Sequence, residues 1–114
     1  MNANIREQYE ARAGVMKALA HPSRLYIVDE LSRGERCVHE LTEAIGSDMS
    51  TVSKHLSVLR SVGIVRDEKR GTEVYYSLRM GCVVDFFGCM EAVLRGEDDA
   101  SCGTGTLRGG RRKR

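Results

Sequence analysis

Four cysteines are the residues of this chain best suited to chemistry: Cys37, Cys82, Cys89 and Cys102. They are widely spaced and include no Cys-x-x-Cys pair, which argues against a closed structural zinc site of the usual spacing. In a reducing compartment, structural disulfides are disfavoured. We therefore interpret the cysteines as small buried apolar residues, metal ligands or redox-active thiols.

The spacing of the cysteines limits how they can share an ion. A site for arsenic(III), zinc or cadmium holds sulfurs about 2.3 Å from the ion, so the sulfurs lie within roughly 4 Å of one another. Cys82 and Cys89 are about 10 Å apart along one helix face. A shared site therefore needs Cys37, a second subunit or a bent approach at Cys82. The predicted metal ligands are Cys37, Cys82 and Cys89, with Cys102 as an additional candidate.

Composition places the chain among globular proteins. Its 114 residues suit one ordinary domain, with 41% hydrophobic and 30% charged residues. No apolar run is long enough to cross a membrane, and the first ten residues lack the apolar stretch of a secretory signal. We therefore expect a cytoplasmic protein that does not enter a membrane.

Charge is unevenly distributed along the chain. Five of the 18 basic residues lie within residues 108–114, and the remaining 13 face 16 acidic residues. Residues 49–79, in contrast, hold six basic residues against three acidic ones. This local excess of positive charge indicates a surface for nucleic acid, although the chain as a whole is nearly neutral.

The apolar pattern predicts a mainly α fold with a small β-hairpin. Residues 64–68 and 73–78 are predicted strands, joined by Lys69-Arg70-Gly71-Thr72. We expect one domain over residues 1–95 and a flexible, disordered tail over residues 96–114. The predicted helices cover residues 5–20, 22–33, 39–45, 49–62 and 82–94.

The last predicted helix is apolar on too many sides for a helix on the surface of a monomer. We expect it to form a homodimer interface together with the first helix. Its bulky apolar residues are Val83, Val84, Phe86, Phe87, Met90, Val93 and Leu94.

The third and fourth predicted helices, separated by a short turn containing Gly46, form a helix-turn-helix. The second helix of such a motif enters the major groove of DNA, and a hairpin after it reaches the backbone or minor groove as a wing. The alternative is a solvated polar face without a partner. The predicted base-reading residues are Ser50, Thr51, Ser53 and His55, and the predicted phosphate or wing contacts are Lys54, Arg60, Lys69 and Arg70.

The run from Val15 to Leu78 resembles the ArsR/SmtB family of metal-responsive repressors. Three stretches carry the resemblance in the order typical of the family: MKALAHPSRLYIVDEL, MSTVSKHLSVLRSVGIV and GTEVYYSL. The resemblance implies a homodimer of winged helices that binds double-stranded operator DNA with an inverted repeat. It also implies that an inducing ligand lowers the affinity for DNA and releases the repressed gene.

The sensor phrase of this chain differs from the family pattern. Arsenic- and cadmium-type members carry a phrase like ELCVCDL, whereas this chain has ERCVHEL, so Cys37 matches the first cysteine and His39 replaces the second. The resemblance therefore makes His39 an additional candidate ligand. Zinc-type members use histidines with carboxylates on the last helix, which here offers Asp85 and Glu91 but no histidine.

These departures favour a soft ligand that prefers thiolates. The first candidate is arsenic(III), followed by cadmium, lead or mercury. The alternative is a redox- or persulfide-responsive repressor that uses a cysteine pair. We do not expect an enzyme, because no pocket-forming motif surrounds Cys37 and His39.

Overall fold

The computed structural model describes residues 1–97. It divides into two compact units, residues 1–80 and a second unit that begins at Gly81. Cys102 and the basic residues of the predicted tail lie outside the described residues.

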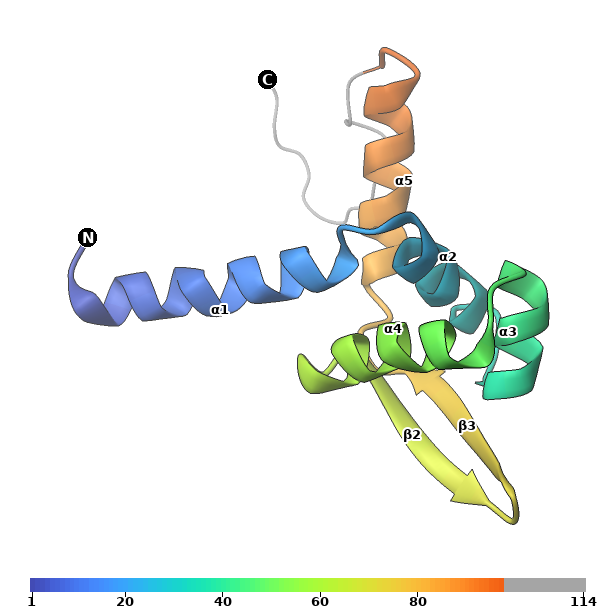
Figure 1. Ribbon diagram of the computed structural model, residues 1–114. Coiled ribbons are helices and arrows are strands. Elements are labelled where there is room, and N and C mark those ends of the chain that lie inside the picture. The colour runs from blue at the N-terminus through green and yellow to red at the C-terminus, as the bar shows by residue number, and fades with distance from the viewer. Residues whose placement is uncertain (98–114) are drawn as a thin grey trace. The chain divides into compact units, whose positions relative to one another are not determined.

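The first unit combines four helices with a small antiparallel sheet (Figure 1). Its strands lie in the order β1-β3-β2. The second unit contributes α5 (Val83–Leu94). This arrangement confirms the expected fold class. In chain order, the elements of the first unit are α1 (Ala3–Leu19), α2 (Pro22–Leu31), β1 (Arg36–Cys37), α3 (Val38–Ile45), α4 (Met49–Ser61), β2 (Val65–Arg70) and β3 (Glu73–Leu78).

Local sequence signals set the boundaries of α3 and α4. Gly46, with a φ of 82°, ends α3 in a left-handed conformation that suits glycine. Asp48 then caps α4 by accepting a hydrogen bond of 2.8 Å from the Thr51 backbone N–H. The hydrogen bonds from Thr51 also hold the pKa of Asp48 below its ordinary value, so the cap stays ionised. A three-residue turn therefore connects the two helices.

The sheet differs from the expectation in two respects. Strand β2 continues to Arg70, and only Gly71 and Thr72 form the turn, where Gly71 adopts a φ of 63° that a tight hairpin needs. Lys69 and Arg70 therefore belong to a strand rather than to a loop. The short segment Arg36–Cys37 pairs with Tyr76 and Tyr75 of β3 and adds a third strand to the hairpin.

The core of the first unit lies between α2, α3, α4 and the sheet. Helix α4 buries Val52, Leu56 and Leu59 on one face. Its opposite face is therefore left exposed. The most deeply buried side chains of this unit are Ile27, Val28, Leu41, Val52, Leu56, Leu59, Ile64 and Val65.

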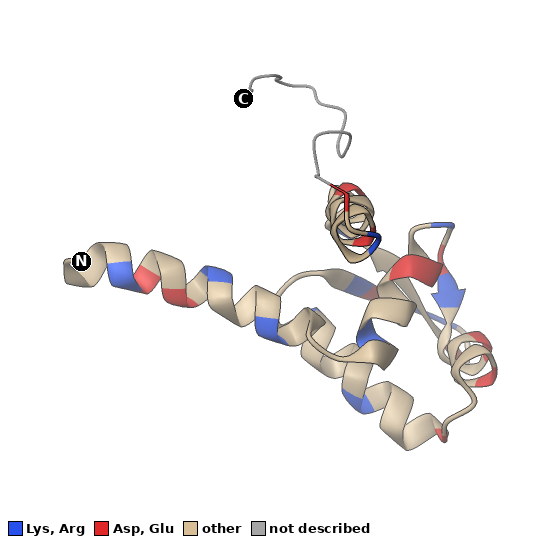
Figure 2. Cartoon of the chain, turned by 90° about the horizontal axis from the view of Figure 1, so that it is seen from above, with Lys and Arg blue, Asp and Glu red and all other residues tan. Residues whose placement is uncertain are grey.

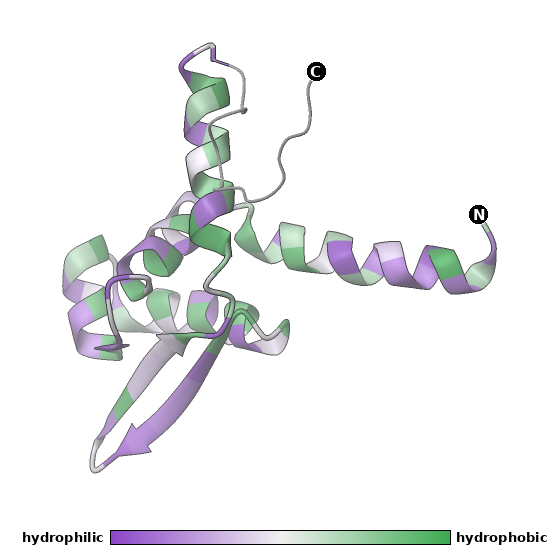
Figure 3. Cartoon of the chain, turned by 180° about the vertical axis from the view of Figure 1, so that it is seen from behind, coloured by the Kyte–Doolittle hydropathy of each residue, from purple (hydrophilic) through white to green (hydrophobic). Residues whose placement is uncertain are grey.

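The helices α1 and α5 carry exposed apolar side chains. Residues 1–13 are all exposed, and α1 buries only Ala18 and Leu19. In α5, Val93 and Leu94 are 60% and 84% exposed, and the hydropathy colours show that apolar residues predominate along this helix (Figure 3). Among residues 1–97, no helix has both the length and the apolarity to cross a membrane.

Replacing Leu56 by alanine tests whether α4 is held by its apolar face. Leu56 is fully buried, so we expect Leu56→Ala to lower the free energy of unfolding by about 2–5 kcal/mol. The exposed neighbour Ser57 provides the control, since Ser57→Ala should change stability by no more than about 0.5 kcal/mol. Chemical denaturation followed by circular dichroism measures both values. Equal effects of the two substitutions would contradict the assigned register of α4.

Candidate functional site

The exposed face of α4 presents a row of short polar side chains and one lysine. Ser50, Thr51, Ser53 and Lys54 are all exposed, and Ser57 extends the row by one turn. The Ser50 hydroxyl donates to Asp48 across 3.2 Å. Short hydroxyl side chains of this kind can approach base edges in a major groove, while Lys54 can reach a phosphate.

His55 has partners inside the protein. Arg24 of α2 donates from its Nε to His55 Nδ1 across 3.1 Å, and its guanidinium also donates to the Ala18 carbonyl across 3.3 Å. The rings of His55 and His21 lie 4.5 Å apart. His21 in turn caps α2, because its Nδ1 accepts from the Ser23 backbone N–H. His55 thereby ties α4 to α1 and α2, and its predicted contact with a base remains a prediction.

This environment disfavours a protonated His55. Burial, followed by the nearby charges of His21 and Arg24, holds the pKa of His55 below its ordinary value. The geometry agrees, since Nδ1 must be unprotonated to accept from Arg24.

The predicted arginine contacts are paired with carboxylates. Arg60 donates to Asp67 of β2 across 2.8 Å. Arg70 donates to both carboxylate oxygens of Glu35, at 2.6 and 3.0 Å, and also contacts Glu68. The hydrogen bonds from Arg70 hold the pKa of Glu35 below its ordinary value. Both arginines must exchange these exposed partners to reach a phosphate.

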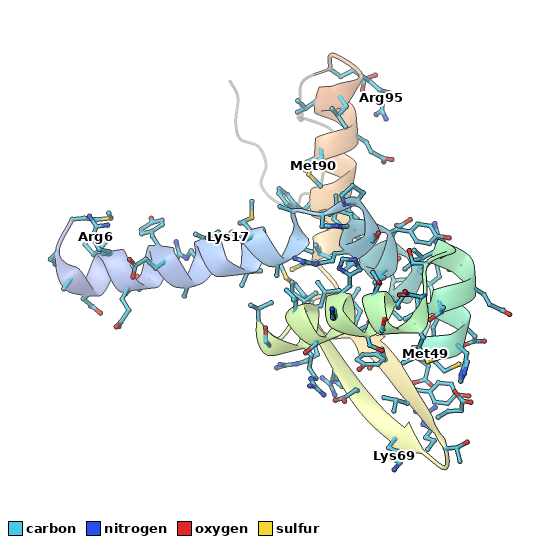
Figure 4. The ribbon with its side chains drawn as sticks, in the orientation of Figure 1. Arg6, Lys17, Met49, Lys69, Met90 and Arg95 are labelled. Carbon is cyan, nitrogen blue, oxygen red and sulfur yellow. The ribbon has the colours of Figure 1, made fainter. Side chains whose placement is uncertain are left out.

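The wing therefore carries charges of both signs. Lys69 is exposed and lies near the tip of the hairpin (Figure 4). Figure 2 shows basic and acidic residues close together on the hairpin. Arg70 also packs over the Tyr75 ring, 4.7 Å from its centroid, which orients its guanidinium.

A second cluster joins the beginning of α3 to strand β3. Cys37, His39 and Glu73 each place a ligand-type atom within 4.8 Å of the other two. His39 Nδ1 lies 2.9 Å from Glu73 Oε1. Cys37 caps α3 from the end of β1 and is only 7% exposed, and its backbone N–H donates to Glu40. The structure thus brings together two of the candidate ligands, Cys37 and His39, with a carboxylate from the wing.

The other cysteine candidates are not part of this cluster. Among the described cysteines, Cys37 and Cys82 are free thiols, and Cys82 is exposed directly before α5. Cys89 lies within α5 and is disulfide-bonded. Their assignment as ligands remains a prediction, and for Cys89 it requires the reduced thiol.

Sequence reasoning missed three residues that shape these sites: Arg24, Glu35 and Glu73. Each contacts its partner across at least 31 positions of the chain. The sequence offers no local signal for such contacts. The pairing of β1 with β3 places Cys37 opposite Tyr75, two residues from Glu73. The sequence could not reveal this pairing, because a strand of two residues has no periodicity.

Acidification tests the environment of His55. Because its pKa is lowered in the folded state, its contribution to stability is complete above the ordinary value of 6.5 and is lost as the pH falls from there through the folded-state pKa. His55→Gln keeps an acceptor for Arg24 but does not titrate. We therefore expect the free energy of unfolding of this variant to decrease less on acidification than that of the wild type. Urea denaturation between pH 7.5 and 5 measures it, with Lys54→Gln as control. A His55→Gln protein with the wild-type pH profile would exclude His55 as the titrating group.

Comparisons with known proteins agree with this geometry. A profile described as "bacterial regulatory protein, arsR family" matches residues 21–67, from the cap of α2 into β2. The transcriptional repressor SmtB of Mycobacterium tuberculosis is 42% identical over 73 residues, which cover 64% of this chain and 54% of SmtB. The chain therefore spans about half the length of that relative. The nodulation protein NolR of Rhizobium meliloti is 33% identical over 94 residues, covering 82% of this chain and 77% of NolR.

Solved structures extend the agreement to the fold. The homodimeric winged helix-turn-helix DNA-binding domain of a possible ArsR-family transcriptional regulator from Mycobacterium bovis matches with a TM-score of 0.72 and 33% identity. The match covers 83% of this chain and 88% of that domain. Helices α3 and α4 thus form the helix-turn-helix, and the β2–β3 hairpin is its wing. On the sequence of its central helices and on its fold, this chain belongs to the ArsR family of bacterial regulatory proteins.

Proposed function

We infer that this protein is a homodimeric, DNA-binding transcriptional repressor that leaves its operator when a thiophilic ligand binds. The observation that carries the proposal is the two-sided character of α4, whose apolar face lies in the core while its polar face is exposed beside a wing. Support also comes from relatives described as a transcriptional repressor and as a winged helix-turn-helix DNA-binding domain.

In this proposal, α4 lies in the major groove of an inverted-repeat operator. Ser50, Thr51 and Ser53 read base edges, and Lys54 contacts a phosphate. Arg60, Lys69 and Arg70 supply further backbone contacts from the end of α4 and from the wing. We assign His55 a positioning role, because Arg24 holds its Nδ1 inside the protein. Such a repressor acts on DNA in the cytoplasm.

Dimerisation would cover the apolar side chains that the single chain exposes. Val84, Phe86, Val93 and Leu94 are exposed on α5, and Ile5, Tyr9 and Met16 are exposed on α1. Apolar surface of this extent is typical of an interface rather than of a solvated monomer surface. The relative from Mycobacterium bovis is described as homodimeric, which supports a pair of reading helices on two half-sites.

Ligand capture at Cys37 would act on the reading helix through a short connection. Cys37 caps α3, and the turn over residues 46–48 connects α3 to α4. Arsenic(III) is the first ligand to test, with Cys82 and Cys89 of either subunit as candidates to complete a thiolate site. Cadmium, lead and mercury follow. A small change in α4 orientation breaks the match to a fixed half-site spacing.

Fluorescence anisotropy of the reduced protein on its own upstream promoter DNA, titrated with arsenite, tests this function. We expect the wild-type protein to bind DNA tightly and to release it at about one arsenite per site. Cys37→Ser should still bind DNA in the presence of arsenite. Binding that is tight but indifferent to every thiophilic ion would remove the ligand-release part of the proposal. An absence of DNA binding at low salt would overturn the proposal as a whole.

A redox-responsive repressor is the second candidate, and the disulfide at Cys89 favours it. Here thiol oxidation or persulfide formation, rather than ion capture, would change the affinity for DNA. Mass spectrometry of the oxidised protein distinguishes the two mechanisms. A defined cysteine crosslink that changes DNA affinity supports redox control, whereas metal retained after desalting supports ion sensing.

The ion pairs of Arg70 generate a prediction about the wing. In Glu35→Gln/Glu68→Gln, Arg70 loses both carboxylate partners and becomes available to a phosphate. We expect tighter DNA binding with a salt-dependence slope that is steeper by about one, as one added phosphate contact requires. Anisotropy at several salt concentrations measures the slope. The control Glu10→Gln/Glu43→Gln removes the same two charges from exposed sites on α1 and α3, and an equal effect there would attribute the change to net charge alone.

A further inference from the structure

We propose that Cys37, His39 and Glu73 form a binding site for a borderline divalent cation of the zinc class, which clamps the beginning of α3 to the wing strand β3. The proposal deepens the proposed function, on which its regulatory part rests. The family resemblance implies a thiolate at Cys37. The contribution of the wing through Glu73, and the resulting mixed donor set, come from the structure.

The three donors are already close to the geometry of a chelate. Their ligand-type atoms lie within 4.8 Å of one another, whereas the ligand atoms around a tetrahedral zinc ion lie about 3.5 Å apart. The Nδ1 of His39 and Oε1 of Glu73 are 2.9 Å apart, a contact that a shared ion would replace. His39 and Glu73 are 63% and 38% exposed, so their side chains have room to rotate towards a shared ion.

The backbone fixes where the donors emerge. Cys37 pairs with Tyr75 across β1 and β3, and Glu73 precedes Tyr75 by two residues on the same face of β3. His39 follows Cys37 in the first turn of α3. Glu40 is occupied by the backbone N–H of Cys37, so it holds the turn in place rather than competing for the ion.

The donor chemistry selects the class of ion. One thiolate, one imidazole and one carboxylate are all accepted by zinc and by ions of similar character. A trigonal arsenic(III) site, in contrast, takes three thiolates, and this cluster offers one sulfur. Solvent can supply a fourth ligand on the exposed side of His39 and Glu73.

Binding exchanges protons for the cation without any change of oxidation state. The Cys37 thiol loses its proton to solvent as the sulfur–metal bond forms, and neutral His39 donates a ring-nitrogen lone pair. Glu73 binds as the carboxylate and gives up its contact with His39.

The clamp would act on both DNA-contacting elements. It joins β3, which carries the wing, to α3, which leads through three residues into α4. Drawing Glu73 towards Cys37 changes the angle between wing and reading helix, and both elements must fit one half-site together.

Cobalt(II) titration of the reduced full chain tests the site, since a thiolate–cobalt bond gives charge-transfer absorption in the near ultraviolet. We expect one Co²⁺ per chain and zinc displacing it. Cys37→Ser should abolish the charge-transfer band, and His39→Gln and Glu73→Gln should each weaken binding by about tenfold or more. The matched control Glu43→Gln, which changes an exposed carboxylate outside the cluster, should bind as the wild type does.

Two outcomes would overturn the site: a charge-transfer band that survives Cys37→Ser, or wild-type affinity in Glu73→Gln. Glu73→Gln tests the site even if Cys37→Ser fails to fold. Glu73 is partly exposed, so the Glu73→Gln protein should fold, and circular dichroism verifies that it does. DNA anisotropy with zinc separates the site from its role. If zinc binds without releasing DNA, the metal site stands and its regulatory role is wrong. If arsenite still releases DNA from Glu73→Gln, the proposed ligand-released repressor stands without a contribution from this clamp.

Discussion

The burial of one face of α4 is the constraint on which the rest of this structure depends. Val52, Leu56 and Leu59 are fully buried, and this fixes the rotation of the helix about its own axis. Since Ser50, Thr51, Ser53 and Lys54 occupy the other side, the same contacts that stabilise the unit present the polar row to solvent. The orientation of the polar row is therefore a consequence of core packing. A core that packed less tightly would let α4 rotate and would disorder the polar row before the protein unfolded.

Polar contacts add to the apolar core in fixing the position of α4. Arg24 joins the end of α1, helix α2 and the side of α4 through Ala18 and His55, so the reading helix is held at a polar point as well as along its apolar face. Exposed ion pairs of the wing have a different effect. The pairs Arg60–Asp67 and Arg70–Glu35 contribute little stability at the surface, but they set which basic groups are available to a phosphate.

The beginning of α3 holds the candidate ligand Cys37 and connects to the helix-turn-helix and the wing. Cys37 ends β1, caps α3 and pairs with the wing strand, so a change at its sulfur bears on three elements at once. In the proposed function, a ligand at Cys37 acts on α4 through this position. In the proposed site, His39 and Glu73 would add a nitrogen and an oxygen to this sulfur, a donor set that zinc-class ions accept.

The sequence by itself determined the elements and their faces. Helical spacing and Gly46 are local signals that predicted the helix-turn-helix, and two short strand patterns predicted the hairpin, each within a few residues. The tertiary structure alone decided the long-range pairings. It extended β2 through Arg70, added β1 to the sheet, turned His55 towards Arg24, and brought Glu73 to Cys37 and His39. The physical reason is that hydrophobic period and capping act over three or four residues, whereas strand register and ion pairs between distant residues exist only once the core has fixed the elements against each other.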